Sequence, residues 1–264
     1  MGLLILLALI TIAAIFNLSL GWVVVFYVIG RLSTLVLASV QFRQLFGSIK
    51  LTLSTESFKT HVFATFMLFA VTGFSYAHFS IDSIALGYLR PYSDVATFGA
   101  AAHLLEASQF AIRPLTIVMF PVCALLCTER KWGEMIRTLK LMFTGALVVG
   151  ILAFATINIL ADFIIEIVYS SRFEESAYIL RILYTSVPGL FVTTVALFVA
   201  ASLNRERHTC LVLISGLALK IVLLPVVAPH YGPIGVAWLN FFTQSIIAVW
   251  LAFDAYRMIL LGRR

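Results

Sequence analysis

Long apolar segments separated by short polar stretches dominate this sequence. Each segment runs for roughly twice the 10 or so residues of a membrane β-strand, and apolar and polar positions do not alternate within it. About 20 mostly apolar residues are enough for a helix to cross a bilayer. We therefore predict about eight membrane-spanning helices, over residues 2–16, 19–41, 60–80, 97–127, 141–160, 176–202, 208–228 and 233–256.

The composition supports an all-α integral membrane protein. Hydrophobic residues make up 62% of the 264 residues and charged residues 11%, whereas soluble domains are about 45–50% apolar and about 25% charged. In lipid, only helices and closed barrels satisfy their own backbone polar groups. The net charge of +6 does not indicate nucleic-acid binding, because the basic residues form no cluster with interleaved aromatic side chains.

Lysine and arginine are distributed unequally between the two sides of the predicted bundle. The gaps after the second, fourth and sixth segments, with the C-terminal tail, hold Arg43, Lys50, Lys59, Arg130, Lys131, Arg137, Lys140, Arg205, Arg207, Arg257, Arg263 and Arg264. The gaps on the other side hold Arg90 and Arg172. Because basic residues concentrate in cytoplasmic loops, we predict a multi-pass protein of the cell (inner) membrane with both termini in the cytoplasm.

Five charged side chains fall well inside the predicted spans: Arg31, Glu106, Arg113, Arg181 and Lys220. A charge at the bilayer centre costs about 2.5–3.5 kcal/mol on insertion scales, so these side chains should face one another, the backbone or water. Arg181 lies near the outer end of its span and can instead extend to water. The excess of positive charge suits an anion such as a lipid-linked phosphate or pyrophosphate, and the five residues are our candidate substrate-binding site.

The segment 97–127 carries a polar face. His103, Glu106, Gln109 and Arg113 recur at spacings of three or four residues, which places them on one side of a helix. Two interpretations are open. The face lines a water-filled cavity, or it joins neighbouring helices through a buried polar network.

No catalytic or metal-binding pattern is present in the sequence. It contains no defensible Ser-His-Asp arrangement, no Walker loop and no metal motif, so we expect neither an enzyme nor a resident cofactor or metal. The three cysteines, Cys123, Cys127 and Cys210, lie in or beside apolar segments, where a thiol side chain commonly fills space.

Five stretches, taken in order, resemble the motifs of one known family. They are "DSIALGYLRPYSDVATFGAAAHLLEA" (82–107), "MFPV" (119–122), "YSSRFEESAYILRIL" (169–183), "ASLNRERHT" (201–209) and "HYGPIGVAW" (230–238). Together they resemble the second half of the multidrug/oligosaccharidyl-lipid/polysaccharide (MOP) flippase superfamily, and within it the polysaccharide (O-antigen type) flippases. Ala96 and Ser170 depart from the family's pattern, since glycine is usual at both places.

The resemblance implies two six-helix lobes that rock around a central cavity. Residues 60–258 would form the second lobe, and residues 1–42 the last two helices of a truncated first lobe. Residues 43–59 would be a cytoplasmic linker with amphipathic spacing, and residues 259–264 a cytoplasmic tail. A missing amino-terminal lobe or other membrane subunits are then expected as protein partners.

The resemblance also implies a transporter that translocates undecaprenyl-pyrophosphate-linked oligosaccharide for cell-surface polysaccharide (O-antigen, lipopolysaccharide) biosynthesis. Arg113 would hold pyrophosphate or an acidic sugar, and Glu106 would orient Arg113 or relay a proton. The alternatives are a multidrug exporter of the same superfamily, a non-transporting membrane scaffold and a polysaccharide-assembly protein. Exporters of cationic drugs favour acidic membrane sites, and an assembly enzyme would carry a long outer loop.

Overall fold

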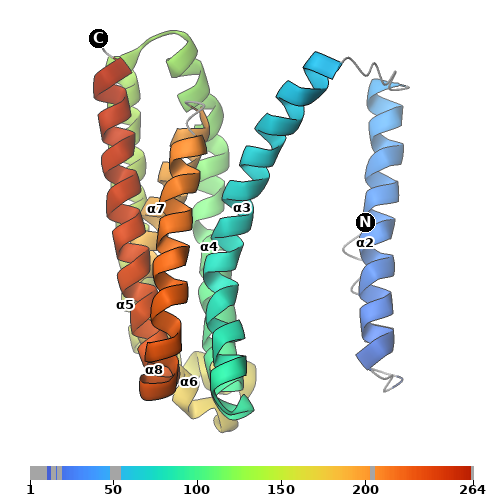
Figure 1. Ribbon diagram of the computed structural model, residues 1–264, viewed down its shortest axis with the longest axis vertical. Coiled ribbons are helices and arrows are strands. Elements are labelled where there is room, and N and C mark those ends of the chain that lie inside the picture. The colour runs from blue at the N-terminus through green and yellow to red at the C-terminus, as the bar shows by residue number, and fades with distance from the viewer. Residues whose placement is uncertain (1–10, 13–15, 17–19, 48–54, 203–205, 263–264) are drawn as a thin grey trace. The chain divides into compact units, whose positions relative to one another are not determined.

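A computed structural model describes residues 11–12, 16, 20–47, 55–202 and 206–262 of the chain. These residues form helices joined by short turns, with no strand among them (Figure 1), so the predicted all-α class is confirmed. The chain divides into two units, Met1–Thr60 and His61–Arg264.

The described part of the first unit is dominated by one long helix, α2 (Leu20–Phe46), which corresponds to the predicted span 19–41. Its apolar side chains point outward, and Val24, Leu32 and Leu35 are each more than half exposed. A helix that is apolar on all sides is suited to lipid rather than to water. The predicted span 2–16 and the middle of the predicted linker lie almost wholly outside the described residues.

The second unit is a bundle of helices, of which α3 begins just before the unit boundary. Its elements are α3 (Thr55–Leu89), α4 (Tyr92–Thr128), α5 (Trp132–Tyr169), the short 3₁₀ helix η1 (Ser171–Phe173), α6 (Glu174–Tyr184), α7 (Val187–Ser202) and α8 (Glu206–Gly262).

Several of these helices are suited to a membrane. Among the described residues, α2, α4, α5 and α8 are long and apolar enough to cross a bilayer, and the bent pair α6–α7 makes a fifth candidate. On α5, the side chains of Leu152, Ile159 and Ile167 are 61%, 79% and 67% exposed, an outward apolar surface that requires lipid. The structure therefore indicates a membrane-embedded helical protein, and the larger count of about eight spans stays a prediction.

Helix α8 is a hairpin of two helical legs. The legs meet at Gly232, whose φ of 59° and ψ of −153° belong to a backbone region that only glycine adopts readily. The legs lie antiparallel, since a Cβ built on Gly216 of the first leg would lie 2.5 Å from Ile247 Cδ1 of the second, and Figure 1 shows α8 turning back at this point. The predicted spans 208–228 and 233–256 are these two legs.

Helices α6 and α7 meet at a bend of 49°, where the sequence predicted one span over residues 176–202. Pro188 lies in the first turn of α7, where its missing N–H has no partner within the helix, and its ring resists a straight continuation of α6. The hydroxyls of Thr185 and Ser186 donate to the carbonyls of Ile182 and Leu183, so the end of α6 keeps its hydrogen bonds.

The helices extend beyond the apolar spans that the sequence predicted. Helix α3 continues to Leu89 instead of ending at residue 80, and α5 covers residues 132–169 instead of 141–160. Hydropathy marks the apolar part of a helix and misses the polar turns at its ends. Here those turns contain Asp82 and Asp162, which the sequence placed outside the spans.

Helices α5 and α7 approach each other closely at Gly150. A Cβ on this glycine would lie 2.6 Å from the Cα of Pro188, so only a residue without a side chain fits. Small residues at such crossings let membrane helices pack backbone against backbone.

We predict that Gly150→Ala lowers the free energy of unfolding by about 1–3 kcal/mol, the usual cost of overpacking, because the two backbones must separate. Gly145→Ala is the matched control, since Gly145 lies on the same helix with nothing within 4 Å of its Cβ position. Thermal unfolding of the purified full chain in detergent measures both. Equal melting temperatures for the two variants would contradict the close approach.

Candidate functional site

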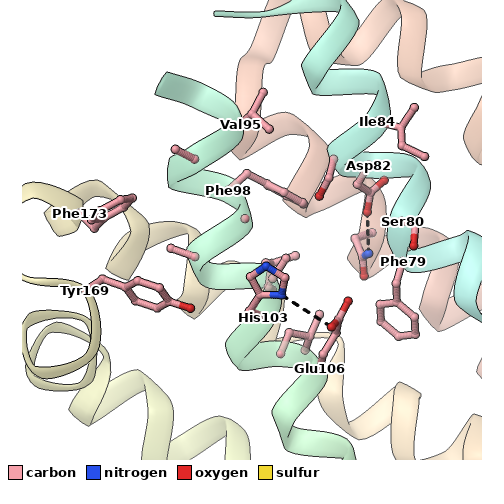
Figure 2. Close-up of a pocket in the computed structure, with 18 residues that line it drawn as sticks. Phe79, Ser80, Asp82, Ile84, Val95, Phe98, His103, Glu106, Tyr169 and Phe173 are labelled. Carbon is pink, nitrogen blue, oxygen red and sulfur yellow. Dashed lines mark hydrogen bonds and ion pairs between the residues drawn. The ribbon is translucent and has the colours of Figure 1, made fainter. Parts of the chain in front are cut away.

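The second unit contains a cavity of about 580 Å³, a volume within the range of about 300–1,000 Å³ that is usual for ligand sites. Its walls come from α3, α4, the α5–η1 turn, α6 and the second leg of α8. The polar and ionisable lining residues are Ser80, Asp82, Ser83, His103, Glu106, Tyr169 and Asn240, and the aromatic ones include Phe79, Phe98 and Phe173 (Figure 2).

A buried ion pair lies beside one wall of this cavity. Lys220 Nζ donates to Asp82 Oδ2 at 2.7 Å and to the backbone carbonyl of His78, also at 2.7 Å. Asn240 Nδ2 donates to the same Asp82 oxygen at 2.9 Å. The side chains of Lys220 and Asp82 are 0% and 1% exposed. The cluster therefore joins α3 to both legs of α8 at a place that water does not reach.

Helix geometry explains how α3 presents this cluster. His78 and Asp82 are four residues apart, so they lie on the same face of α3, one turn from each other. Asp82 Oδ1 has no hydrogen-bond partner among the described residues. Asp82 also lines the cavity, but Oδ1 itself is buried, so a ligand would reach this oxygen only after a small movement of the wall. A buried acceptor without a partner is uncommon and marks a candidate site.

The opposite wall is the polar face of α4. Glu106 is half-exposed, its Oε2 lies 3.7 Å from His103 Nδ1, and both side chains are visible in Figure 2. Gln109, one turn farther along, lines a neighbouring cavity of about 260 Å³ that shares Phe79 with the first. Three residues of the predicted polar face thus line cavities: His103 and Glu106 line the first, and Gln109 lines the second.

Helix α6 contributes Leu183 to the cavity wall and is held against α4 by two hydrogen bonds. Ser176 Oγ donates to the carbonyl of Thr97 at 2.8 Å, and the Tyr184 hydroxyl donates to the carbonyl of Leu104 at 3.0 Å. Both acceptors lie on the stretch of α4 that bears His103. The orientation of that polar face is therefore fixed by contacts with α6.

The five candidate residues from the sequence do not share one site. Glu106 lines the cavity, and Lys220 lies behind its wall in the ion pair with Asp82. The exposed Arg113 stacks over the ring of Phe110, with 5.1 Å from its Cζ to the ring centroid.

The last two candidates lie elsewhere. Arg181 pairs with Asp162 and donates to the carbonyl of Asn158 at 3.3 Å. Arg31 belongs to the first unit, where its Nη2 donates to the Tyr27 hydroxyl at 2.9 Å.

This placement changes the count of charges inside the bundle. The sequence count of interior charges omitted Asp82 and Asp162, because both lay beyond the predicted spans, and these acids pair with two of the four basic residues. The ionisable residues that line the cavity within the described structure are Asp82, His103, Glu106 and Tyr169. The lining thus holds two carboxylates, of which Lys220 neutralises Asp82 from behind the wall, and no lysine or arginine. We call it the acidic cavity after this lining, and the positive, anion-binding interior stays a prediction.

The lining chemistry suits a ligand that donates hydrogen bonds. Ionised carboxylates accept hydrogen bonds only, so Asp82 and Glu106 favour hydroxyl groups or cations, and aromatic rings pack against the apolar faces of such ligands. The residues that the sequence missed here are Asp82 as a buried pair member and Asn240. Within the described chain, no three His, Cys, Asp or Glu side chains are grouped as a metal site requires.

Comparison of the chain with protein-family models, with curated proteins and with solved structures finds no match in any of the three.

The buried pair makes a testable prediction about stability. Lys220→Met or Asp82→Leu alone should lower the free energy of unfolding by about 3–5 kcal/mol, because either change leaves the other charge buried without its partner. The double variant should unfold near the wild-type temperature, since both charges are gone. Thermal unfolding of the full chain in detergent tests this, and a double variant as unstable as the two single changes combined would contradict the pairing.

Proposed function

We propose that this chain belongs to a transporter of the cell inner membrane that translocates undecaprenyl-pyrophosphate-linked oligosaccharide. The observation that carries the proposal is the buried cluster of Lys220, Asp82 and Asn240 beside an acidic, aromatic-lined cavity. Ionisable residues inside membrane helices are costly and are usually retained for function. The order of the sequence motifs supports the same class of protein.

In this proposal the cavity receives sugar rather than phosphate. Sugar hydroxyls would donate to the half-exposed Glu106 of α4 and, after a small movement of the wall, to the buried, unpartnered Oδ1 of Asp82 on α3. The rings of Phe79 and Phe98 offer flat apolar surfaces for the C–H faces of a sugar. The lining offers no lysine or arginine to a pyrophosphate, and Glu106 would repel it, so the proposal places the anionic part of the substrate outside this cavity.

Arg113 is our proposed partner for the pyrophosphate. It lies seven residues beyond Glu106 on α4, about 10 Å along the helix axis, and its guanidinium is exposed, with its face over Phe110. Arg181 and Lys220 serve mainly to join helices, because each forms an ion pair with an acid of another helix. Both termini lie in the cytoplasm in this proposal, as the distribution of basic residues predicts.

A second candidate function is the export of cationic compounds. The acidic and aromatic lining of the cavity favours it, since aromatic faces and carboxylates both attract cations. The two functions differ in their substrates and therefore in their assays. A flippase restores surface polysaccharide to a bacterial host that lacks its own flippase, and an exporter lowers the accumulation of a cationic dye.

We predict that Glu106→Gln lowers the restored polysaccharide by about tenfold or more, the effect of losing a hydrogen bond to a charged group. Glu129→Gln is the matched control, because Glu129 lies at the end of α4 in an exposed pair with Lys131. Surface polysaccharide is measured in the complemented host at equal protein levels. If the wild type restores no polysaccharide and Glu106→Gln reduces the export of a cationic dye, the second function is favoured.

The charge-free double variant Lys220→Met/Asp82→Leu separates a structural role of the cluster from a functional one. Because it removes the proposed sugar acceptor at Asp82, it should lower polysaccharide transport by about tenfold or more while the protein still folds. The same complementation assay is read together with protein abundance in the membrane. Wild-type transport by this variant would assign the cluster to stability alone.

A further inference from the structure

A second large cavity lies between α3 and the first leg of α8, away from the acidic one. Its volume is about 640 Å³. Its lining is apolar apart from one arginine and consists of Phe66, Phe69, Ala70, Gly73, Phe74, Ala77, Arg207, Cys210, Leu211, Ile214 and Leu217. We refer to these residues as the α3–α8 groove.

The shape of the groove follows from the helix positions that form it. On α3 the lining residues recur every three or four positions, so they form one stripe along the helix. Ala70, Gly73 and Ala77 supply the small positions of this stripe, and nothing lies within 4 Å of a Cβ built on Gly73. Phe66 and Phe69 are 58% and 70% exposed. The α3 side of the groove thus combines small residues with exposed phenylalanine rings.

Its single charged residue lies at one end. Arg207 begins the lining on α8, and Leu217 ends it ten residues later, about 15 Å along the helix. In the topology predicted from the basic residues, the Arg207 end faces the cytoplasm. An arginine there lies where lipid phosphates are found, and its planar guanidinium matches phosphate oxygens, while the groove runs from it toward the membrane centre.

We propose that the α3–α8 groove binds the polyprenyl chain of the lipid-linked substrate in the cytoplasmic leaflet, with Arg207 at its phosphate. This inference rests on the proposed function and adds the site that first receives the lipid. The small positions of α3 recur about once per helical turn of 5.4 Å, and an isoprenoid chain carries its methyl branches at a comparable repeat. A straight acyl chain has no branches to place in these positions.

The test is photolabelling of the full chain in nanodiscs of zwitterionic phospholipid with a diazirine-bearing polyprenyl phosphate. Labelled peptides should come from residues 66–77 and 207–217, and unlabelled undecaprenyl phosphate should compete. Gly73→Leu should lower labelling about fivefold or more, because packing contacts rather than the hydrophobic effect hold a chain within a bilayer. Arg207→Gln should weaken labelling in the same peptides.

Gly87→Leu is the matched control. Gly87 lies on the same helix, is exposed and has nothing within 4 Å of its Cβ position, so leucine fits there without filling the groove. This variant should label like the wild type, and both leucine variants should melt at similar temperatures.

Three outcomes would overturn the inference. They are equal competition by phosphatidylglycerol, unchanged labelling of Gly73→Leu, and a crosslink from Gly73→Cys to α2, which would show that a helix fills the groove. Specific polyprenyl labelling at other peptides would overturn the groove while leaving the proposed transport intact. Polyprenyl labelling of the α3–α8 groove without polysaccharide transport in the complementation assay would overturn the proposed transport while leaving the groove as a lipid site.

Discussion

The arrangement of the second unit depends on burying one lysine in an apolar bundle. Lys220 is fully buried, and an unpaired charge in such a place costs several kcal/mol. Asp82 neutralises it from α3, and Asn240 approaches the same carboxylate from the second leg of α8. Both legs reach Asp82 only because α8 folds back at Gly232. The hairpin therefore brings both donors to one carboxylate, and these contacts connect α3 to the two legs of α8.

The same contact produces the chemistry of the cavity. Asp82 uses Oδ2 for Lys220 and Asn240, which leaves its buried Oδ1 without a hydrogen-bond partner just behind the cavity wall. Carboxylate oxygens can each accept more than one hydrogen bond, so concentrating two donors on one oxygen leaves the other for a ligand. The Lys220–Asp82 pair that connects α3 to α8 thereby also leaves an unused hydrogen-bond acceptor beside the acidic cavity.

The sequence allowed much of this arrangement to be predicted, but not the pairing of charges. The length of the apolar segments located the long helices, and the spacing of His103 and Glu106 placed both on the face that lines the cavity. Arg113 shares that face in projection, yet it lies about 10 Å farther along the axis and leaves the cavity. Asp82 was missed because α3 continues past its apolar part, and its partner Lys220 lies 138 residues away, a separation that no local pattern bridges.

Helix α3 contributes to both sites proposed for the substrate. The α3–α8 groove occupies residues 66–77 of this helix, and the acidic cavity begins at Phe79. The groove would receive the apolar chain first, with its phosphate at Arg207, and the cavity would receive the hydroxyl-rich headgroup in a later step of transport. A lipid-linked sugar carries both parts, and because Arg207 lies at the end of the groove away from the cavity, the two sites would be occupied one after the other. A cationic drug has no need of this division, because it would bind the acidic cavity alone and leave the groove without a role.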